Sequence, residues 1–255
     1  MESSTLNLDA SAKPMPTTEL FYKSLNPSAT ETILLIHGAC GGHKEWDDVA
    51  PDLILKGYHV LLPDLPAHGN SLKKTQAKQS RAHIVGLSLG AHIAACIAEH
   101  AKPGMILSVI ASGYNTIPQP HFLTPILTPP IFVLHHITNF VACPREELAQ
   151  LKNGEAGYGL MAAVVKAICE PRKIGAIRVR LLAVCAASPE TYLGRDKVKC
   201  SRMLLERVVD GDGSRAVLHR GIRHGWHMEE PAMFAEMILA WVREEKLDDA
   251  FEDME

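Results

Sequence analysis

The chain has 255 residues, of which 47% are hydrophobic and 22% are charged, and its formal net charge is -3. This length and composition fit one globular α/β domain with room for a small insertion and a large hydrophobic core. The small negative charge and the lack of a basic run exclude an electrostatic basis for binding nucleic acid or an anionic membrane.

Continuous apolar runs, rather than alternating ones, predict strands that are buried on both faces, as in a parallel sheet. A short edge strand at Leu20–Tyr22 is expected to precede them. The expected strands are, in chain order, Thr32–Ile36, Tyr58–Leu62, Ala82–Val85, Met105–Ile110, Val179–Val184 and Ala216–Leu218, the last strand of the chain.

Helical patterns separate these runs. Trp46, Val49 and Leu53 fall at helical spacing, although Pro51 indicates a break or a restart. Further helices are expected over Ala91–Ala101, around Met203–Val208, and from Pro231 onward, where apolar residues recur on one face. The alternation of strands and helices predicts a doubly wound sheet with its site at the C-terminal ends of the strands.

One turn stands out, because a Gly-x-Ser-x-Gly pentad with Ser88 at its centre joins the run at Ala82–Val85 to an Ala-rich helix-forming segment. A strand that turns straight into a helix needs a sharp bend, and Gly86 and Gly90 leave room for it because they carry no Cβ. We therefore expect an exposed nucleophilic serine beside the positive end of a helix. The alternative is a serine in an ordinary β-to-α loop.

Two segments depart from a regular alternation. Between the second and third buried strands, residues 72–80 carry no apolar stripe, so a crossover helix is missing, through a true loss or an error in the gene model. Residues 117–175 begin Pro-rich and become helix-like at Glu146–Leu151 and Leu160–Ile168, which predicts a cap over the site. Two ordinary crossover helices are the alternative. The predicted core is then residues 1–116 and 176–255.

Cysteine usage and the chain ends indicate the compartment. Six scattered cysteines with no metal-type spacing predict free core thiols in a reducing environment. The N-terminus lacks the basic and apolar parts of a signal peptide, and no apolar stretch reaches the length of a membrane span. We expect a cytoplasmic protein without a metal or cofactor.

Four motifs, in this order along the chain, resemble the α/β-hydrolase family, and in detail they look most like small fungal hydrolases, some of which serve secondary metabolism. They are Ile36-His37-Gly38, the segment from Pro63-Asp64 to Ser71, the pentad around Ser88, and Arg223-His224-Gly225 through Pro231. The resemblance implies an α/β-hydrolase fold, a mostly parallel doubly wound sheet with a small helical cap. It also implies acyl-transfer chemistry on a small-molecule acyl substrate.

The resemblance assigns roles to single residues. Ser88 is the expected nucleophile and His224 the expected base, with His227 as the competing choice. A zinc site at the two histidines is disfavoured because no third ligand has suitable spacing. The family's oxyanion hole maps to the backbone N–H groups of Ala39 and Leu89.

The acid of the expected Ser-His-Asp triad is displaced, because the usual position after Val179–Val184 carries no aspartate. Asp196 in Gly-Arg-Asp-Lys-Val is the choice, and Glu190 is the second candidate. Asp196 capping the following helix is the structural alternative.

The expected function is hydrolysis of a small ester, thioester or lactone through an acyl-enzyme, as a carboxylesterase, thioesterase or lactonase would perform it. An acyltransferase would use the same residues. The displaced acid and the short crossover also allow a degenerate, non-catalytic binding protein of the same fold. The substrate and the oligomeric state do not follow from the sequence.

Overall fold

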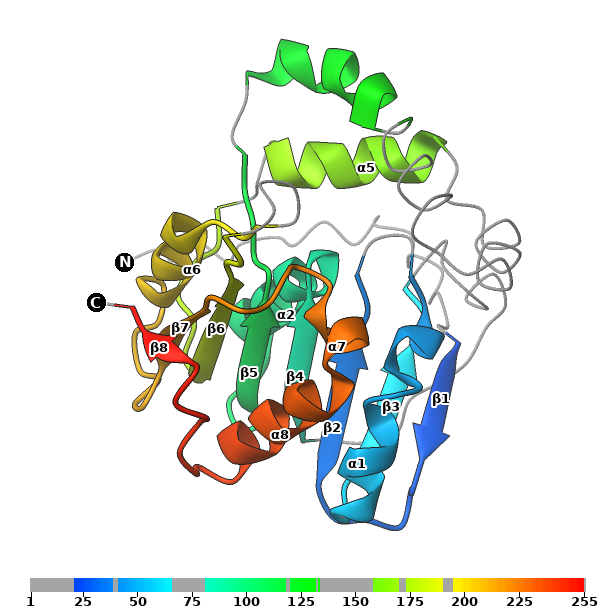
Figure 1. The fold of residues 1–255 in the computed structure, drawn as a ribbon, viewed down its shortest axis with the longest axis vertical. Helices are drawn as coiled ribbons and strands as arrows, with labels where there is room; N and C mark the ends of the chain where they lie inside the picture. Colours follow the sequence, from blue (N-terminus) through cyan, green and yellow to red (C-terminus); the bar gives the residue numbers. More distant parts are fainter. Residues whose placement is uncertain are drawn as a thin grey trace, which may run out of the picture.

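An eight-stranded sheet, in the order β1-β3-β2-β4-β5-β6-β7-β8, forms the centre of the molecule (Figure 1). The computed structural model describes residues 21–38, 41–65, 81–117, 120–131, 133, 158–169, 173–189 and 195–254. The strands are Tyr22–Leu25 (β1), Thr32–Ile36 (β2), His59–Pro63 (β3), Ala82–Leu87 (β4), Ile106–Ser112 (β5), Arg180–Ala186 (β6), Arg215–His219 (β7) and Glu252–Asp253 (β8). The six inner strands are parallel, and β1 and β8 are antiparallel at the two edges.

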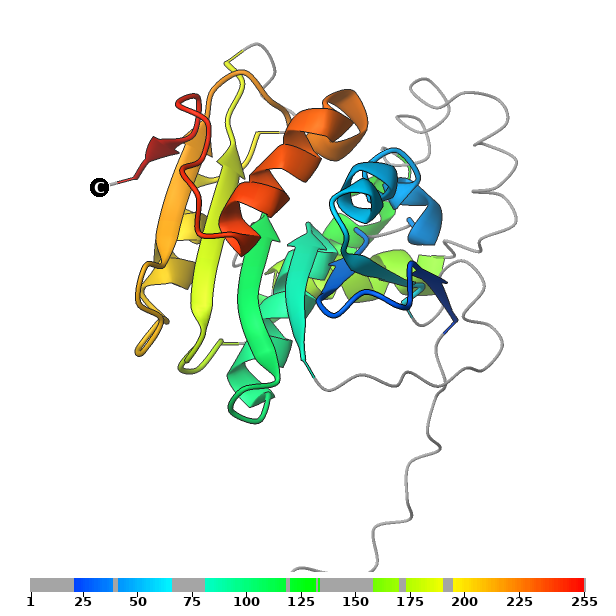
Figure 2. The ribbon, with the colours of Figure 1, turned by 90° about the horizontal axis from the view of Figure 1, so that it is seen from below.

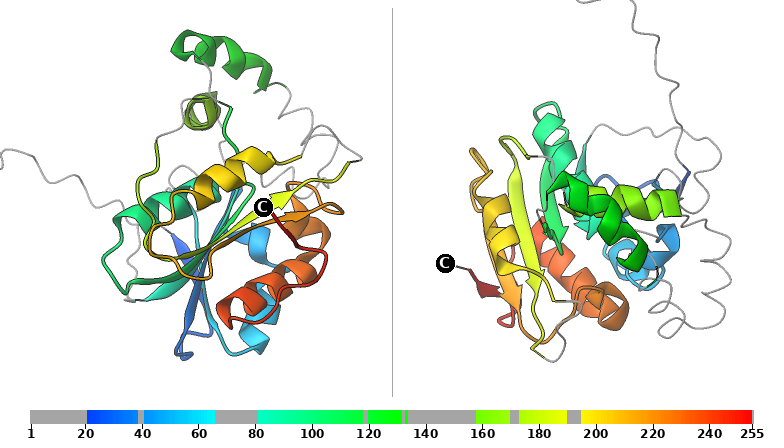
Figure 3. Two further views of the ribbon diagram at one scale, coloured as in Figure 1. Left: turned by 90° about the vertical axis from the view of Figure 1, so that its left-hand side faces the viewer. Right: turned by 90° about the horizontal axis from the view of Figure 1, so that it is seen from above.

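Helices cover both faces of the sheet, as Figures 2 and 3 show, so the predicted doubly wound, mostly parallel architecture is confirmed. One face packs against α1 (Ala50–Leu55) and α8 (Pro231–Val242), around the fully buried side chains of Trp46 and Phe234. The other face packs against α2 (Leu89–His100) and α6 (Val198–Leu205). Small alanines of α2 let this helix lie close to β4 and β5.

The helical pattern around Trp46 forms two separate elements, with a restart near Pro51 as expected. A 3₁₀ turn over His43–Trp46 (η1) ends before α1, and Pro51 lies in the first turn of α1, where its missing N–H costs no hydrogen bond. Trp46 is completely buried and packs against the rings of His227 and Phe234. It is a core residue that joins η1 to the C-terminal helices.

The chain between β5 and β6 leaves the sheet. A 3₁₀ turn over His121–Leu123 (η2) continues into helical residues 124–131. Helix α5 (Tyr158–Cys169) lies beyond the C-terminal ends of the parallel strands (Figure 1). Val165 and Cys169 of α5 form a small cluster with Leu127. Helix formation within the Pro-rich part was not predicted. The helix predicted at Glu146–Leu151 falls outside the described residues, and the division into core and cap stays a prediction.

Two sequence-based boundaries were wrong. The last strand is β8, after the final helix, and not Ala216–Leu218; Arg215 and Arg220 of β7 and its loop hold β8 by ion pairs to Asp253 and Glu252. The helix expected around Met203–Val208 is α6, which begins at Val198, while Val208 forms an isolated bridge to Ile177. Short polar strands carry no hydrophobic period, which is why β8 escaped detection. Residues 72–80 lie outside the described part of the chain.

Four of the cysteines lie in the described residues; they form no disulfide with one another, and three of them are buried. In the same residues, no helix is both long enough and apolar enough to cross a membrane.

In the β4–α2 turn, the backbone of the turn lies very close to the backbone of β2. Ser88 has φ 55° and ψ -114°, in the left-handed region that side chains avoid, at a cost of about 1–3 kcal/mol. A Cβ on Gly90 would lie 2.2 Å from the carbonyl oxygen of Ile36, and one on Gly86 would lie 2.2 Å from that of Gly90. The two glycines of the pentad are therefore steric requirements of this turn.

We predict that Gly90→Ala lowers the free energy of unfolding by about 1–3 kcal/mol, because the new methyl group meets rigid backbone of β2. Gly225→Ala is the matched control, since its Cβ would find only the Met228 methyl group, at 3.4 Å. We expect this control to change stability by less than about 1 kcal/mol. Urea denaturation measures both variants. Equal stability of the two would contradict the packing described for the turn.

Candidate active site

Ser88 stands at the C-terminal end of β4, as the pentad predicts. Its backbone N–H donates to the carbonyl of Ser112 at the end of β5, and its carbonyl accepts from Ala91 in the first turn of α2. The side chain is half-buried, beside the N-terminus of α2, whose free N–H groups favour negative charge. This placement is the one expected for a nucleophile.

Asp196 and His224 form a short hydrogen bond, with 2.6 Å between His224 Nδ1 and Asp196 Oδ1. The two residues are 28 positions apart and lie in the loops after β6 and β7. Asp196 is nearly fully buried, and its other carboxylate oxygen accepts from the backbone N–H of Ala186 at 2.8 Å. A carboxylate held in this way accepts a hydrogen bond from Nδ1–H of the imidazole, which orients the ring and leaves Nε2 free to accept a proton.

Two residues that the sequence reasoning missed help to hold this pair. The Asn115 side-chain amide donates to Asp196 Oδ1 at 2.7 Å, and its oxygen accepts from the Lys197 backbone N–H at 2.8 Å. Gly113 has φ +69°, and a Cβ there would lie 2.6 Å from His224 Cε1. For Gly113, the sequence did offer a signal, because a glycine ends a buried strand there. Nothing local marks Asn115, which meets Asp196 across 81 positions.

The pKa of His224 lies above its ordinary value of 6.5. Burial lowers the pKa of this imidazole, but the hydrogen bond and charge of Asp196, together with the charge of Glu45, outweigh burial. The site therefore stabilises the imidazolium form, which is the form a general base reaches when it takes a proton.

His227, the competing base, lies in a different environment. It is 2% exposed, packs against Trp46 and Phe234, and has no hydrogen-bond partner on either ring nitrogen among the described residues. Burial, followed by the charge of His224, lowers its pKa to about 4, so it is neutral at pH 7. The described part of the chain holds no cluster of three metal-ligating side chains.

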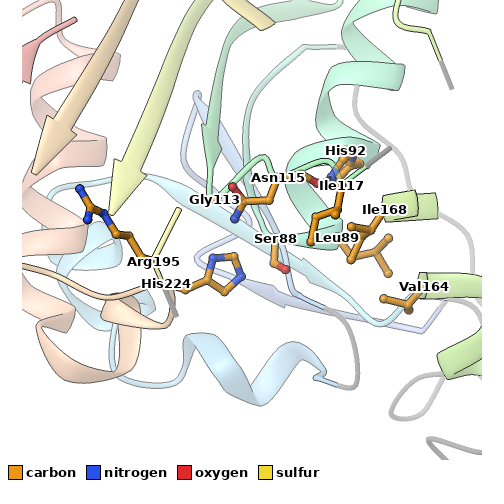
Figure 4. Close-up of a pocket in the computed structure, with 10 residues that line it drawn as sticks. All are labelled: Ser88, Leu89, His92, Gly113, Asn115, Ile117, Val164, Ile168, Arg195 and His224. Carbon is orange, nitrogen blue, oxygen red and sulfur yellow. Dashed lines mark hydrogen bonds between the residues drawn. The ribbon is translucent and has the colours of Figure 1, made fainter. Parts of the chain in front are cut away.

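A cavity of about 250 Å³ opens between the sheet edge and α5. Ser88 and His224 lie next to one another in its wall, and apolar side chains line the opposite side (Figure 4). The lining residues are Ser88, Leu89, His92, Gly113, Asn115, Ile117, Val164, Ile168, Arg195 and His224. Among the described residues, no hydrogen bond joins the Ser88 hydroxyl to the His224 ring, and sites without substrate often show such a long or poorly aligned pair.

The loop after β2 lies against the nucleophile. A Cβ on Gly38 would be 3.5 Å from that of Ser88. His37 is fully buried and bridges the Gly38 carbonyl and the Leu65 N–H through its two ring nitrogens, so it shapes this loop. Leu89 begins α2, so its N–H belongs to the donors at a helix N-terminus. Ala39 and Glu190 fall outside the described residues, so both assignments stay predictions.

Three comparisons bear on the family. The sequence model of the alpha/beta hydrolase fold matches residues 31–78. An AB hydrolase superfamily protein of Gibberella zeae is 39% identical over 93% of this chain and 89% of its own length. An esterase from Exiguobacterium antarcticum superposes with a TM-score of 0.65 at 12% identity, covering 88% of this chain and 95% of that one.

An N-acyl homoserine lactone degrading enzyme superposes with a TM-score of 0.59 at 16% identity, covering 87% of this chain and 96% of that one. At such identities the two solved structures support the fold, and the relative in Gibberella zeae supports the family. The fold predicted from the four motifs is confirmed. This chain belongs to the α/β-hydrolase superfamily and has its fold.

Proposed function

We propose that this protein is a serine hydrolase that cleaves a small ester, thioester or lactone through an acyl-enzyme intermediate. The observation that carries the proposal is the 2.6 Å bond between His224 and the buried Asp196, in the wall of the same cavity as the strained Ser88. Membership of a hydrolase family supports it, as do the esterase and the lactone-degrading enzyme among proteins of this fold.

In the first step, Ser88 Oγ attacks the acyl carbon while its proton passes to Nε2 of His224. The electron pair of the carbonyl moves to oxygen, and the resulting oxyanion is stabilised by the backbone N–H groups of Leu89 and Ala39. Collapse of this intermediate expels the alkoxide or thiolate, which takes the proton from His224. Asp196 orients the imidazole and stabilises the imidazolium throughout.

In the second step, water repeats the sequence on the acyl-enzyme and releases the acid, with Ser88 regenerated. An acceptor alcohol or thiol in place of water would give acyl transfer with the same residues. The cavity favours a compact, apolar acyl group, because the side chains of Leu89, Ile117, Val164 and Ile168 form its apolar wall.

We predict that a fluorophosphonate probe labels the wild type and labels neither Ser88→Ala nor His224→Ala. The probe forms a bond only with an activated serine, so both nucleophile and base are required. Labelling is read by fluorescence after gel separation, and circular dichroism controls for folding. A folded wild type that remains unlabelled would favour a non-catalytic binding protein of the same fold.

The pH profile tests the role of Asp196. Because the pKa of His224 is raised, kcat/KM should fall as pH drops through a midpoint above 6.5. Asp196→Asn removes the charge that raises this pKa, so the midpoint should move to lower pH, and kcat should fall by about 10⁴-fold. If kcat and the midpoint are unchanged in Asp196→Asn, Asp196 is not the acid of the triad, and Glu190 becomes the candidate to test.

Acyl-chain selectivity tests the cavity. Val164→Trp should reduce kcat/KM for hexanoyl esters at least about tenfold and leave acetyl esters nearly unchanged, because the indole fills the apolar end. Lys166→Trp places the same residue on the exposed side of α5 and is the matched control. A series of p-nitrophenyl esters gives the ratio. If Val164→Trp lowers kcat/KM equally for acetyl and hexanoyl esters, the acyl chain does not lie against Val164.

A further inference from the structure

Glu45 is a carboxylate in an unusual position for its sequence context. It lies in the polar run His43-Lys44-Glu45 of η1, yet its side chain is only 20% exposed and turns inward. Its Oε2 accepts a hydrogen bond from the backbone N–H of Gly38 at 3.1 Å. Its other oxygen fills the space beside Gly41, where a Cβ would lie 1.5 Å from it.

The same carboxylate acts on two histidines that follow β7 in the chain. Its Oε2 lies 3.8 Å from Nε2 of His227, and its charge acts on His224. The loop after β2 and the loop that carries the base thus meet at one acidic group. Glu45 is not among the hydrogen-bond partners described above for Asp196 or for the backbone of Ser88.

We propose that Glu45 is a positioning residue of this active site: its carboxylate fastens the backbone N–H of Gly38 beside Ser88 and sets a second negative charge toward His224. The inference rests on the proposed function. The first action holds the loop in which Gly38 precedes Ala39, the predicted oxyanion donor. The second stabilises the imidazolium formed when His224 takes the serine proton.

Burial makes the charge of Glu45 sensitive to pH near neutrality. Burial raises the pKa of Glu45 to about 7, against the opposing effects of the Gly38 N–H and the His224 charge. A glutamine at this position still offers the Gly38 N–H an oxygen of the same reach, so it keeps an acceptor for this hydrogen bond. What glutamine lacks is the charge.

The test compares Glu45→Gln with Glu229→Gln. Glu229 lies in α7 (Trp226–Glu229), close to His224 in the sequence, and pairs with the exposed Arg223, so its variant removes one charge near the same loop without touching Gly38. Two quantities are measured near pH 8, where Glu45 is mostly ionised: the second-order rate of labelling by a fluorophosphonate, and kcat and KM for a p-nitrophenyl ester. The pKa of His224 is measured separately by NMR in a Ser88→Ala background, which needs no activity.

We expect Glu45→Gln to lower the labelling rate and kcat by about tenfold with little change in KM, and to move the His224 titration to lower pH. Glu45→Asp keeps the charge and should recover part of the titration shift. Glu229→Gln should leave rates within about twofold of wild type.

Unchanged rates and an unchanged His224 titration in Glu45→Gln would overturn the inference while the wild type still reacts with the probe. A titration shift without any loss of rate would also overturn it, because the charge would then act on His224 to no effect. A wild type that fails to react removes the proposed function, and the inference with it.

Discussion

The close contact of Gly90 with the carbonyl oxygens of Ile36 and His37 determines the geometry of the whole C-terminal edge of the sheet. It brings the start of α2 against the end of β2 with no side chain between them. The turn must then pass through Ser88 with a positive φ, and the serine is left beside Gly38. Ser88 and the loop after β2 are therefore placed by one steric constraint.

A second constraint positions His224 beside Ser88 (Figure 4). The His224 ring occupies the space that a side chain at position 113 would need, and the Trp226 indole donates to Ser112 at the end of β5. The loop after β7 is thus fixed to β5, the strand next to the one that carries Ser88. Because Asp196 is held by Ala186 and Asn115, it and His224 meet on rigid supports rather than on free loops.

The parts predicted from the sequence are those with a local signal. Buried parallel strands have continuous apolar runs, and the two glycines around Ser88 indicate a sharp strand-to-helix turn. The fold and the place of Ser88 at this turn therefore follow from short windows of sequence. Asp196 and His224 came from matching motif order to a family, and the structure brings them together at 2.6 Å.

The remaining residues are defined by contacts between distant segments. Asn115 meets Asp196 across 81 positions, and Glu45 sits in a polar run that reads as a solvated surface. In β8, two acidic residues pair with arginines rather than with a core, so no periodicity marks the strand. Backbone donors such as the N–H of Ala39 leave no trace in side-chain identity at all.

The antiparallel pairing of β8 with β7 has a consequence for assembly of the chain. Until residues 252–253 arrive, β7 presents the open edge of a parallel sheet, with free N–H and C=O groups that can template another chain. The arginine–carboxylate pairs that close this edge join residues 38 and 32 positions apart, so the edge stays open until both partners are in place. Removal of residues 252–253 would expose β7, an edge separated from β4 by β5 and β6, and would therefore affect aggregation of the protein more than the geometry around Ser88.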